Sequence, residues 1–287
     1  MNSKKKILIV GGNSIISNNL IKHFEKKSID YLATTRRSVN DSHFVFLDLF
    51  QTSSLNRLSG VNFSAVILCA SICSVDECEK NKKYTNQINV LNTFKLVSVL
   101  KNTAPDLRVV MLSTDMVLDG AKEKPTQFEK TEPLTEYGRQ KAELEQKLMN
   151  RYENIKVLRF GKVIEKSSIL FNGWVDKLKI GEKITVFNDL VFAPISIDYA
   201  IQSILHEINI RNSSNEIVHV SSGCDISYYE AALWLSKNLN LSSQLVEGVS
   251  VHDKFPLKII PKRIALGNNL EIPTALKGIE ALKVFLE

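Results

Sequence analysis

The sequence predicts an α/β protein built on a parallel, doubly wound β-sheet, with a smaller lobe toward the C-terminus. Short apolar runs rich in β-branched residues alternate with longer segments of helical periodicity. This alternation is typical of βαβ units, in which helices cover both faces of a parallel sheet. The expected strands are 7–10, 31–35, 44–47, 65–68, 108–112 and 156–158, and the expected helices are 15–27, 84–101 and 136–150.

The pattern loosens after residue 165, where the second lobe is expected to begin. Helices are expected at 170–178, 197–208 and 227–239, and strands at 184–187 and 217–220. Three prolines divide the stretch from Lys254 onward into loops and a last helix: Pro256, Pro261 and Pro273. We expect residues 1–165 to form the first domain, completed by strands and helices within 190–222, and residues 166–287 to form an interleaved second lobe.

The composition suits a globular protein and argues against several functional classes. The chain has 287 residues, 44% hydrophobic and 24% charged, with a formal net charge of +6 spread along the sequence. We therefore expect no nucleic-acid surface, and no stretch has the length of a membrane span. The cysteines form no C-x-x-C pair and have no histidine at metal spacing: Cys69, Cys73, Cys78 and Cys224. We expect no metal and no disulfide, and a cytoplasmic location.

The glycines after the first strand indicate a Rossmann-type cofactor site. A strand that leads through glycine into a helix presents backbone N–H groups and the helix dipole to a pyrophosphate. The turn reads Gly11-Gly12-Asn13-Ser14-Ile15-Ile16-Ser17. Of the G-x-x-G-x-x-G pattern only Gly11 is kept, and Ser14 and Ser17 take the other two glycine places. A turn that binds no ligand is the alternative interpretation.

The end of the second strand indicates which dinucleotide binds. NAD sites carry an acidic residue there, which accepts from the ribose 2′-hydroxyl. Here the strand at 31–35 is followed by Arg36-Arg37, and Asp30 precedes it. Two guanidiniums favour a 2′-phosphate, so we predict NADPH in preference to NADH.

Tyr137 and Lys141 have the spacing of a carbonyl-reducing site. Residues four apart lie on one face of a helix, so the ammonium favours the ionised form of the phenol. A phenol with a lowered pKa can protonate a carbonyl oxygen while a hydride arrives at the carbon.

These features resemble the extended short-chain dehydrogenases that act on nucleotide sugars, in particular the dTDP-4-dehydrorhamnose reductase family. The most specific matches are Ser113-Thr114-Asp115-Met116-Val117-Leu118-Asp119-Gly120 and the Tyr-Gly-x-x-Lys segment. Other matching stretches are 11–17, 71–79, 88–90, 192–194 and 219–223.

By this resemblance Tyr137 is the general acid, Lys141 binds the nicotinamide ribose, and Thr114 binds the substrate carbonyl oxygen. Asn89 resembles the residue that positions the lysine. The implied cofactor-binding residues are Gly11, Asn13, Ser14, Ile15, Ile16, Arg36, Arg37, Asp48, Leu49, Cys69, Ala70, Ser71, Asn89, Tyr137 and Lys141. The implied substrate residues are Thr114, Asp115, Trp174 and Phe192, although a core position is the alternative for both aromatics.

The resemblance implies an NADPH-dependent reductase of a 4-keto-6-deoxy nucleotide sugar that serves surface polysaccharide synthesis. Related dehydratases carry Glu where this chain has Met116, and methionine transfers no proton, so reduction is favoured over dehydration. Two alternatives stay open: a nucleotide-sugar epimerase, and a regulatory subunit that binds NADP without catalysis. Dimers are common in this superfamily, and a homodimer is compatible with the sequence.

Overall fold

The computed structural model describes residues 5–38, 40–58, 60–210, 212–254, 262–267, 270–273 and 275–286. The chain divides into two compact units, and it passes between them several times. The first unit comprises Met1–Leu118, Thr131–Arg159 and Ile204–Val218, and the second comprises Asp119–Lys130, Phe160–Ser203 and His219–Glu287. Pro256 and Pro261, expected to interrupt the C-terminal stretch, lie outside the described residues.

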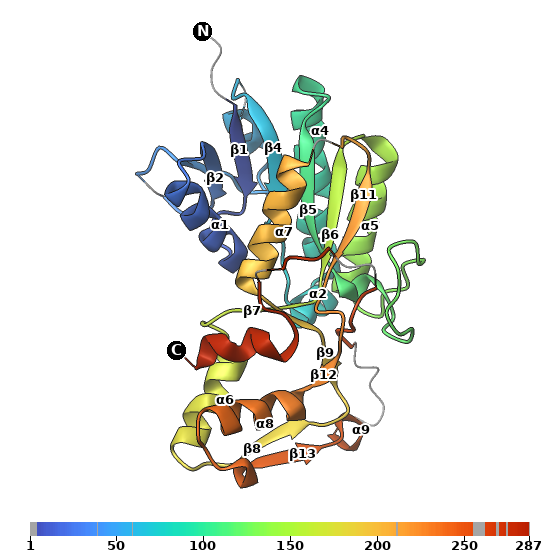
Figure 1. The fold of residues 1–287 in the computed structure, drawn as a ribbon. Helices are drawn as coiled ribbons and strands as arrows, with labels where there is room; N and C mark the ends of the chain where they lie inside the picture. Colours follow the sequence, from blue (N-terminus) through green and yellow to red (C-terminus); the bar gives the residue numbers. More distant parts are fainter. Residues whose placement is uncertain are drawn as a thin grey trace. The chain divides into compact units, whose positions relative to one another are not determined.

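A seven-stranded sheet forms the centre of the first unit, in the order β11-β6-β5-β4-β1-β2-β3 (Figure 1). The pairs β1–β2, β1–β4, β2–β3 and β4–β5 are parallel. The predicted doubly wound α/β fold is therefore confirmed. The strands are β1 (Lys6–Val10), β2 (Tyr31–Thr35), β3 (Phe44–Phe46), β4 (Phe63–Leu68), β5 (Arg108–Thr114), β6 (Ile155–Phe160) and β11 (Glu216–Val220).

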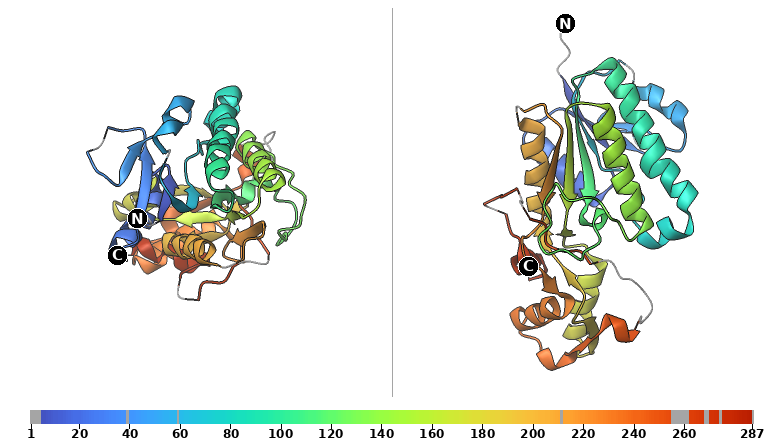
Figure 2. Two further views of the ribbon diagram at one scale, coloured as in Figure 1. Left: turned by 90° about the horizontal axis from the view of Figure 1, so that it is seen from above. Right: turned by 90° about the vertical axis from the view of Figure 1, so that its right-hand side faces the viewer.

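Helices lie on both faces of this sheet because the strand order runs outward in both directions from the β1–β4 pair. Right-handed crossovers then place the β1–β2 helix and the β4–β5 helices on opposite faces. Figure 2 shows α4 (Thr93–Thr103) and α5 (Glu136–Arg151) side by side on one face. The remaining helices of this part are α1 (Ile15–Lys26), α2 (Val75–Lys80), α3 (Lys82–Asn86) and α7 (Ile197–Asn209).

The single helix expected at 84–101 is a composite. It begins as α3, passes through a π-helical segment at Gln87–Asn92 and continues as α4. The short helix α2 before it was not expected. π-Helical turns inside helices are frequent at functional sites, and this one carries Asn89.

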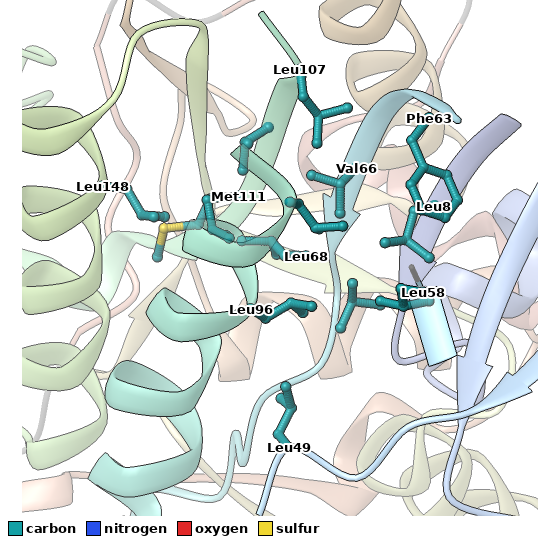
Figure 3. Close-up of a cluster of buried hydrophobic side chains, with 14 of the residues drawn as sticks. Leu8, Leu49, Leu58, Phe63, Val66, Leu68, Leu96, Leu107, Met111 and Leu148 are labelled. Atoms are coloured by element: carbon teal, nitrogen blue, oxygen red, sulfur yellow. The ribbon is translucent and has the colours of Figure 1, made fainter. Parts of the chain in front are cut away.

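The hydrophobic core of the first unit lies between the sheet and the α4–α5 layer (Figure 3). Leu8 on β1, Val66 on β4 and Met111 on β5 are almost fully buried and contribute to it. Leu96 and Leu148 supply the helical side of the same cluster. These strands are buried on both faces and carry almost continuous apolar residues, as parallel strands do.

The second unit has its own core, built around α6 and α8. The expected helices at 170–178 and 227–239 and the expected strand at 184–187 are confirmed. The expected last helix is a 3₁₀ segment at Gly278–Phe285. The other elements are β7 (Lys162–Ile164), α6 (Ile169–Lys179), β8 (Ile184–Phe187), β9 (Val191–Phe192), β10 (Pro194–Ser196), β12 (Ile226–Ser227), α8 (Tyr228–Asn238), β13 (Val246–Val249) and α9 (Val251–Lys254). Among the described residues, no helix is both long and apolar enough to span a membrane.

Candidate active site

A cavity of about 560 Å³ lies within the first unit, at the carboxyl ends of β1, β2 and β4. This is the edge at which open α/β sheets bind their ligands. Most of the expected cofactor residues line it: Gly11, Asn13, Ser14, Arg36, Arg37, Asp48, Leu49, Cys69, Ala70 and Ser71. Ile15, Ile16, Asn89, Tyr137 and Lys141 are not among the lining residues. The sequence did not indicate Val10, Thr34, Thr35, Leu47, Ile72 or Ile88, which also line it.

Gly11 is fixed in a conformation that suits glycine alone. Its φ is +90°, and a Cβ built there would lie 2.7 Å from the backbone nitrogen of Ala70. Its N–H donates to the Thr34 hydroxyl at 2.9 Å. The turn therefore brings the ends of β1, β2 and β4 together, which no larger residue at this position allows.

Ser14 and Ser17 replace two glycines of the usual pattern, and both are integrated into the turn. The Ser14 hydroxyl caps α1 by accepting from the Ser17 N–H at 3.1 Å. Ser17 is fully buried, and its hydroxyl donates to the Gly11 carbonyl at 2.8 Å. The two hydroxyls also lie 2.8 Å apart. The two serines therefore stabilise the turn through side-chain hydrogen bonds that glycines could not make.

The residues around the cavity fit a nicotinamide dinucleotide. The positive-φ Gly11 turn leads directly into the N-terminus of α1, where a pyrophosphate is stabilised. At the end of β2, Thr35 donates to the Asn13 side chain and accepts from the Arg37 N–H. The exposed side chains of Arg36 and Arg37 follow. The lining residues therefore place two guanidiniums where an NAD site carries its carboxylate.

Tyr137 and Lys141 lie on the first turns of α5, which Thr135 caps by accepting from the Gly138 N–H at 3.1 Å. The Lys141 ammonium lies 5.8 Å from the centre of the Tyr137 ring and donates to the Leu112 carbonyl at 3.0 Å. Both side chains are buried, and the Tyr137 ring packs in a cluster with Cys78, Met116 and Ile72. Ile72, which packs against this cluster, also lines the cavity.

Gly138 allows α5 to approach the turn that follows β5. A Cβ at this position would lie only 2.2 Å from the Met116 carbonyl oxygen. The Gly of the Tyr-Gly-x-x-Lys segment is therefore required for close backbone contact. This requirement was not predictable from the sequence, because the contact joins segments more than 20 residues apart.

Thr114 ends β5 and is almost completely buried, as is Asp115. The Thr114 hydroxyl donates to the Asp115 carboxylate at 3.0 Å and accepts from the Met116 N–H at 3.2 Å. The Thr114 hydroxyl is therefore engaged within the turn that follows β5, and its expected role of binding a substrate oxygen stays a prediction.

Asn89 is buried, and its side chain makes five hydrogen bonds, one of them to the Cys78 sulfur and none to Lys141. It accepts from the Ile72 N–H at 2.7 Å and from the Ser71 hydroxyl at 3.1 Å. It donates to the Ile72 carbonyl at 3.0 Å and to Gln140 at 2.8 Å. Asn89 therefore joins the cavity wall to α5 one residue before Lys141.

Burial dominates the electrostatics of this region. It lowers the pKa of Lys141, while nearby negative groups, Glu145 among them, oppose the shift. Burial also raises the pKa of the Cys69 thiol to about 11, with the Ser17 hydroxyl and the Lys141 charge opposing that shift.

The two aromatics expected near the substrate lie in the second unit. Trp174 packs edge-on against Phe171, with ring centres 5.1 Å apart. Phe192 has no exposed surface and stacks on Tyr228 at 4.5 Å. Both belong to the hydrophobic core of that unit, in line with the alternative interpretation from the sequence.

The fold, the glycine turn and the Thr114–Tyr137–Lys141 set define an oxidoreductase of the extended short-chain dehydrogenase/reductase class. The chain belongs to the family described as the RmlD substrate binding domain, whose model matches residues 5–263. No curated protein sequence matches it at a significant level.

Several solved structures share the fold. The dTDP-4-dehydrorhamnose reductase of Bacillus anthracis str. Ames, in complex with NADP, has a TM-score of 0.82 at 20% identity, with 98% of each chain covered. MoeE5, in complex with UDP-glucuronic acid and NAD, has a TM-score of 0.81 at 18% identity, with 98% of this chain and 97% of that chain covered. The Bordetella bronchiseptica enzyme WbmG, in complex with NAD and UDP, has a TM-score of 0.81 at 16% identity, with 99% and 94% covered.

Proposed function

We propose that the chain is an NADPH-dependent reductase of a 4-keto-6-deoxy nucleotide sugar. The observation that carries the proposal is the packing of Ile72, a lining residue of the cavity, against the buried cluster that contains Tyr137. Family membership and the reductase of Bacillus anthracis, which was solved with NADP, support the substrate class and the cofactor.

In this mechanism the bound nicotinamide supplies a hydride to C4 of the sugar. Tyr137 donates its phenolic proton to the carbonyl oxygen as that oxygen gains charge. Lys141, held by the Leu112 carbonyl, favours the ionised form of the phenol that this transfer leaves. Thr114 orients the oxygen through its hydroxyl. Met116 stands where related dehydratases carry Glu, so position 116 offers no carboxyl group for water elimination.

The preference for NADPH rests on Arg36 and Arg37. Both line the cavity together with the carboxylate Asp48. Among the described contacts, Asp48 Oδ1 accepts from the Phe50 N–H at 2.9 Å and forms no ion pair with either arginine. A 2′-phosphate would gain charge-assisted hydrogen bonds from the guanidiniums that a 2′-hydroxyl would not. Comparable affinities of the protein for NADH and NADPH, measured by calorimetry, would contradict this preference.

The test is the Tyr137→Phe variant, with Tyr84→Phe on the exposed face of α3 as the matched control. With a panel of 4-keto nucleotide sugars and NADPH, we expect Tyr137→Phe to lose about 10²–10⁴-fold in turnover. NADPH affinity and thermal stability should stay near those of the control. A folded Tyr137→Phe protein with full turnover would exclude the proposed acid.

Two other outcomes would each support one of the alternative functions. Tightly retained NAD with no net cofactor oxidation would identify a nucleotide-sugar epimerase. Failure to bind either cofactor, together with co-purification of an unrelated enzyme, would identify a regulatory subunit.

A further inference from the structure

A buried ion pair lies directly behind the Tyr137–Lys141 pair. Glu145 follows Lys141 by four residues on α5, and its side chain is 4% exposed. Arg159 on β6 is 2% exposed, and its Nη2 lies 2.7 Å from a Glu145 carboxylate oxygen. The Arg159 Nε lies 3.2 Å from the same oxygen and 3.3 Å from the other. Tyr137, Lys141 and Glu145 therefore form one buried stripe along α5.

The Glu145 carboxylate also reaches the strand that carries Thr114. The Ser113 hydroxyl, one residue before Thr114, donates to Glu145 Oε1. The carboxylate is thus held from two sides, by a hydroxyl on β5 and by a guanidinium on β6. It joins the element that bears Thr114 to the helix that bears Tyr137 and Lys141.

Several ionisable groups face the Lys141 ammonium, and only one of them is a carboxylate. Tyr137 and Glu145 come from α5 itself. The others are the thiols of Cys69 and Cys73 between β4 and α2, and of Cys78 on α2. Burial raises the pKa of Cys69 to about 11 and also raises that of Cys78, so both thiols are neutral near pH 7. Glu145 is therefore the buried carboxylate whose charge acts on Lys141 from the same helix.

We propose that Glu145 is a positioning residue of the site, which keeps the buried Lys141 ammonium charged and aligned beneath the Tyr137 phenol. Arg159 and Ser113 hold the carboxylate in place for this role. A buried lysine without an opposing charge tends to lose its proton. A neutral amine would no longer lower the pKa of the phenol. The link to proton transfer rests on the function proposed above, whereas the effect on Lys141 does not.

The competing interpretation is that the Glu145–Arg159 pair only stabilises the fold. Removing one partner of a buried pair leaves an uncompensated charge and is costly, whereas replacing both partners is often tolerated. Stability alone therefore does not separate the two roles. The protonation of Lys141 does, because a purely structural pair would leave it unchanged.

The test measures Lys141 directly, without cofactor or substrate. Protein labelled with ¹³C at lysine Cε is titrated by NMR from pH 6 to 11, and the Lys141→Met variant identifies the signal. We expect Glu145→Gln to lower the Lys141 titration midpoint by about one pH unit or more. Glu143→Gln is the matched control, because Glu143 lies on α5 but pairs at the surface with Lys147 and Asn86.

The double variant Glu145→Gln/Arg159→Gln removes both buried charges and is used where Glu145→Gln alone does not fold. A smaller fall in the Lys141 midpoint is expected in it, because the loss of the Arg159 charge offsets part of the loss of the carboxylate. An unchanged midpoint in folded Glu145→Gln, or a midpoint that rises in the double variant, would overturn the proposal. Failure of both variants to fold would assign the pair to the fold alone and overturn it equally.

The activity measurement distinguishes this inference from the proposed function. If the protein reduces a 4-keto nucleotide sugar, the alkaline limb of its pH profile should move to lower pH in Glu145→Gln, in step with the Lys141 midpoint. A shifted midpoint in a protein without reductase activity would uphold the role of Glu145 and reject the proposed function.

Discussion

Cys69 follows the last residue of β4 in the wall of the cavity, and the pKa of its thiol is raised by burial. With a pKa of about 11, its thiol is protonated at neutral pH, and the reactive thiolate increases as the pH rises toward 11. We expect iodoacetamide at pH 8 to modify Cys69 about 100-fold more slowly than the exposed Cys73. Peptide mass spectrometry after short pulses at pH 7, 8 and 9 measures both rates. Equal rates at pH 8 would show that the thiol is neither buried nor protonated.

Gly138 lies against the Met116 carbonyl, and a substitution there should disturb the site through the backbone. Because a Cβ would lie 2.2 Å from that oxygen, we expect Gly138→Ala to cost about 1–3 kcal/mol of stability. Gly173→Ala on α6 is the control, since a Cβ there meets nothing within 4 Å. It should stabilise by about 0.5–1 kcal/mol, as alanine does inside a helix. Urea unfolding of both variants measures the two changes in the free energy of unfolding. If Gly138→Ala stabilised the protein as Gly173→Ala is expected to do, the close contact would be contradicted.

The residues that perform chemistry were predictable because their spacing has a direct physical meaning. Tyr137 and Lys141 lie one helical turn apart in any α-helix, so their proximity follows from the sequence. Glu145 has the same spacing from Lys141, yet nothing in the sequence distinguished it from a solvated helix residue. Its partner Arg159 lies on β6, and only the tertiary fold brings the carboxylate and the guanidinium together.

The turn between β1 and α1 depends on the two serines that replace glycines. Ser17 is fully buried and donates to the Gly11 carbonyl, so Ser17→Ala removes a buried hydrogen bond. We expect a loss of about 1 kcal/mol in stability and a weaker affinity for NADPH, because the Gly11 turn is less well held. Thermal unfolding and calorimetric titration measure these effects.

The control for Ser17 is Ser53→Ala, an exposed serine on the 3₁₀ segment Thr52–Leu58. Ser53→Ala should change neither the thermal stability nor the affinity for NADPH. An affinity for NADPH that rises in Ser17→Ala would mean that the serine weakens the cofactor site.

The composite helix from Lys82 to Thr103 marks the limit of prediction from periodicity. Apolar spacing predicted one continuous helix at 84–101, and the segment is indeed helical throughout. The π-helical turn at Gln87–Asn92 was not predictable, because it accompanies the buried contacts of Asn89 with the loop after β4 and with Gln140. Local propensity contains no information on such long-range hydrogen bonds.

Strand β11 completes the sheet from a part of the chain remote from the other six strands. Residues 204–218 belong to the first unit, although the βα alternation of the sequence ends near residue 165. Arg108 on β5 reinforces the connection, because its guanidinium donates to the carbonyls of Glu207, Ile208 and Asn212. Alternation alone revealed six strands in order, but it did not place the seventh beside β6.

A fragment of residues 1–165 should therefore fail to fold as an independent domain. It would leave the β6 edge unpaired and remove the carbonyls of Glu207, Ile208 and Asn212 to which the Arg108 guanidinium donates. Unpaired strand edges also promote aggregation. Circular dichroism melting and size-exclusion chromatography should show no cooperative transition and a large associated fraction.

A fragment of residues 1–222 retains every segment of the first unit and should regain a cooperative transition. A cooperative, monomeric 1–165 fragment would mean that β11 and the Arg108 contacts contribute little to the stability of the sheet.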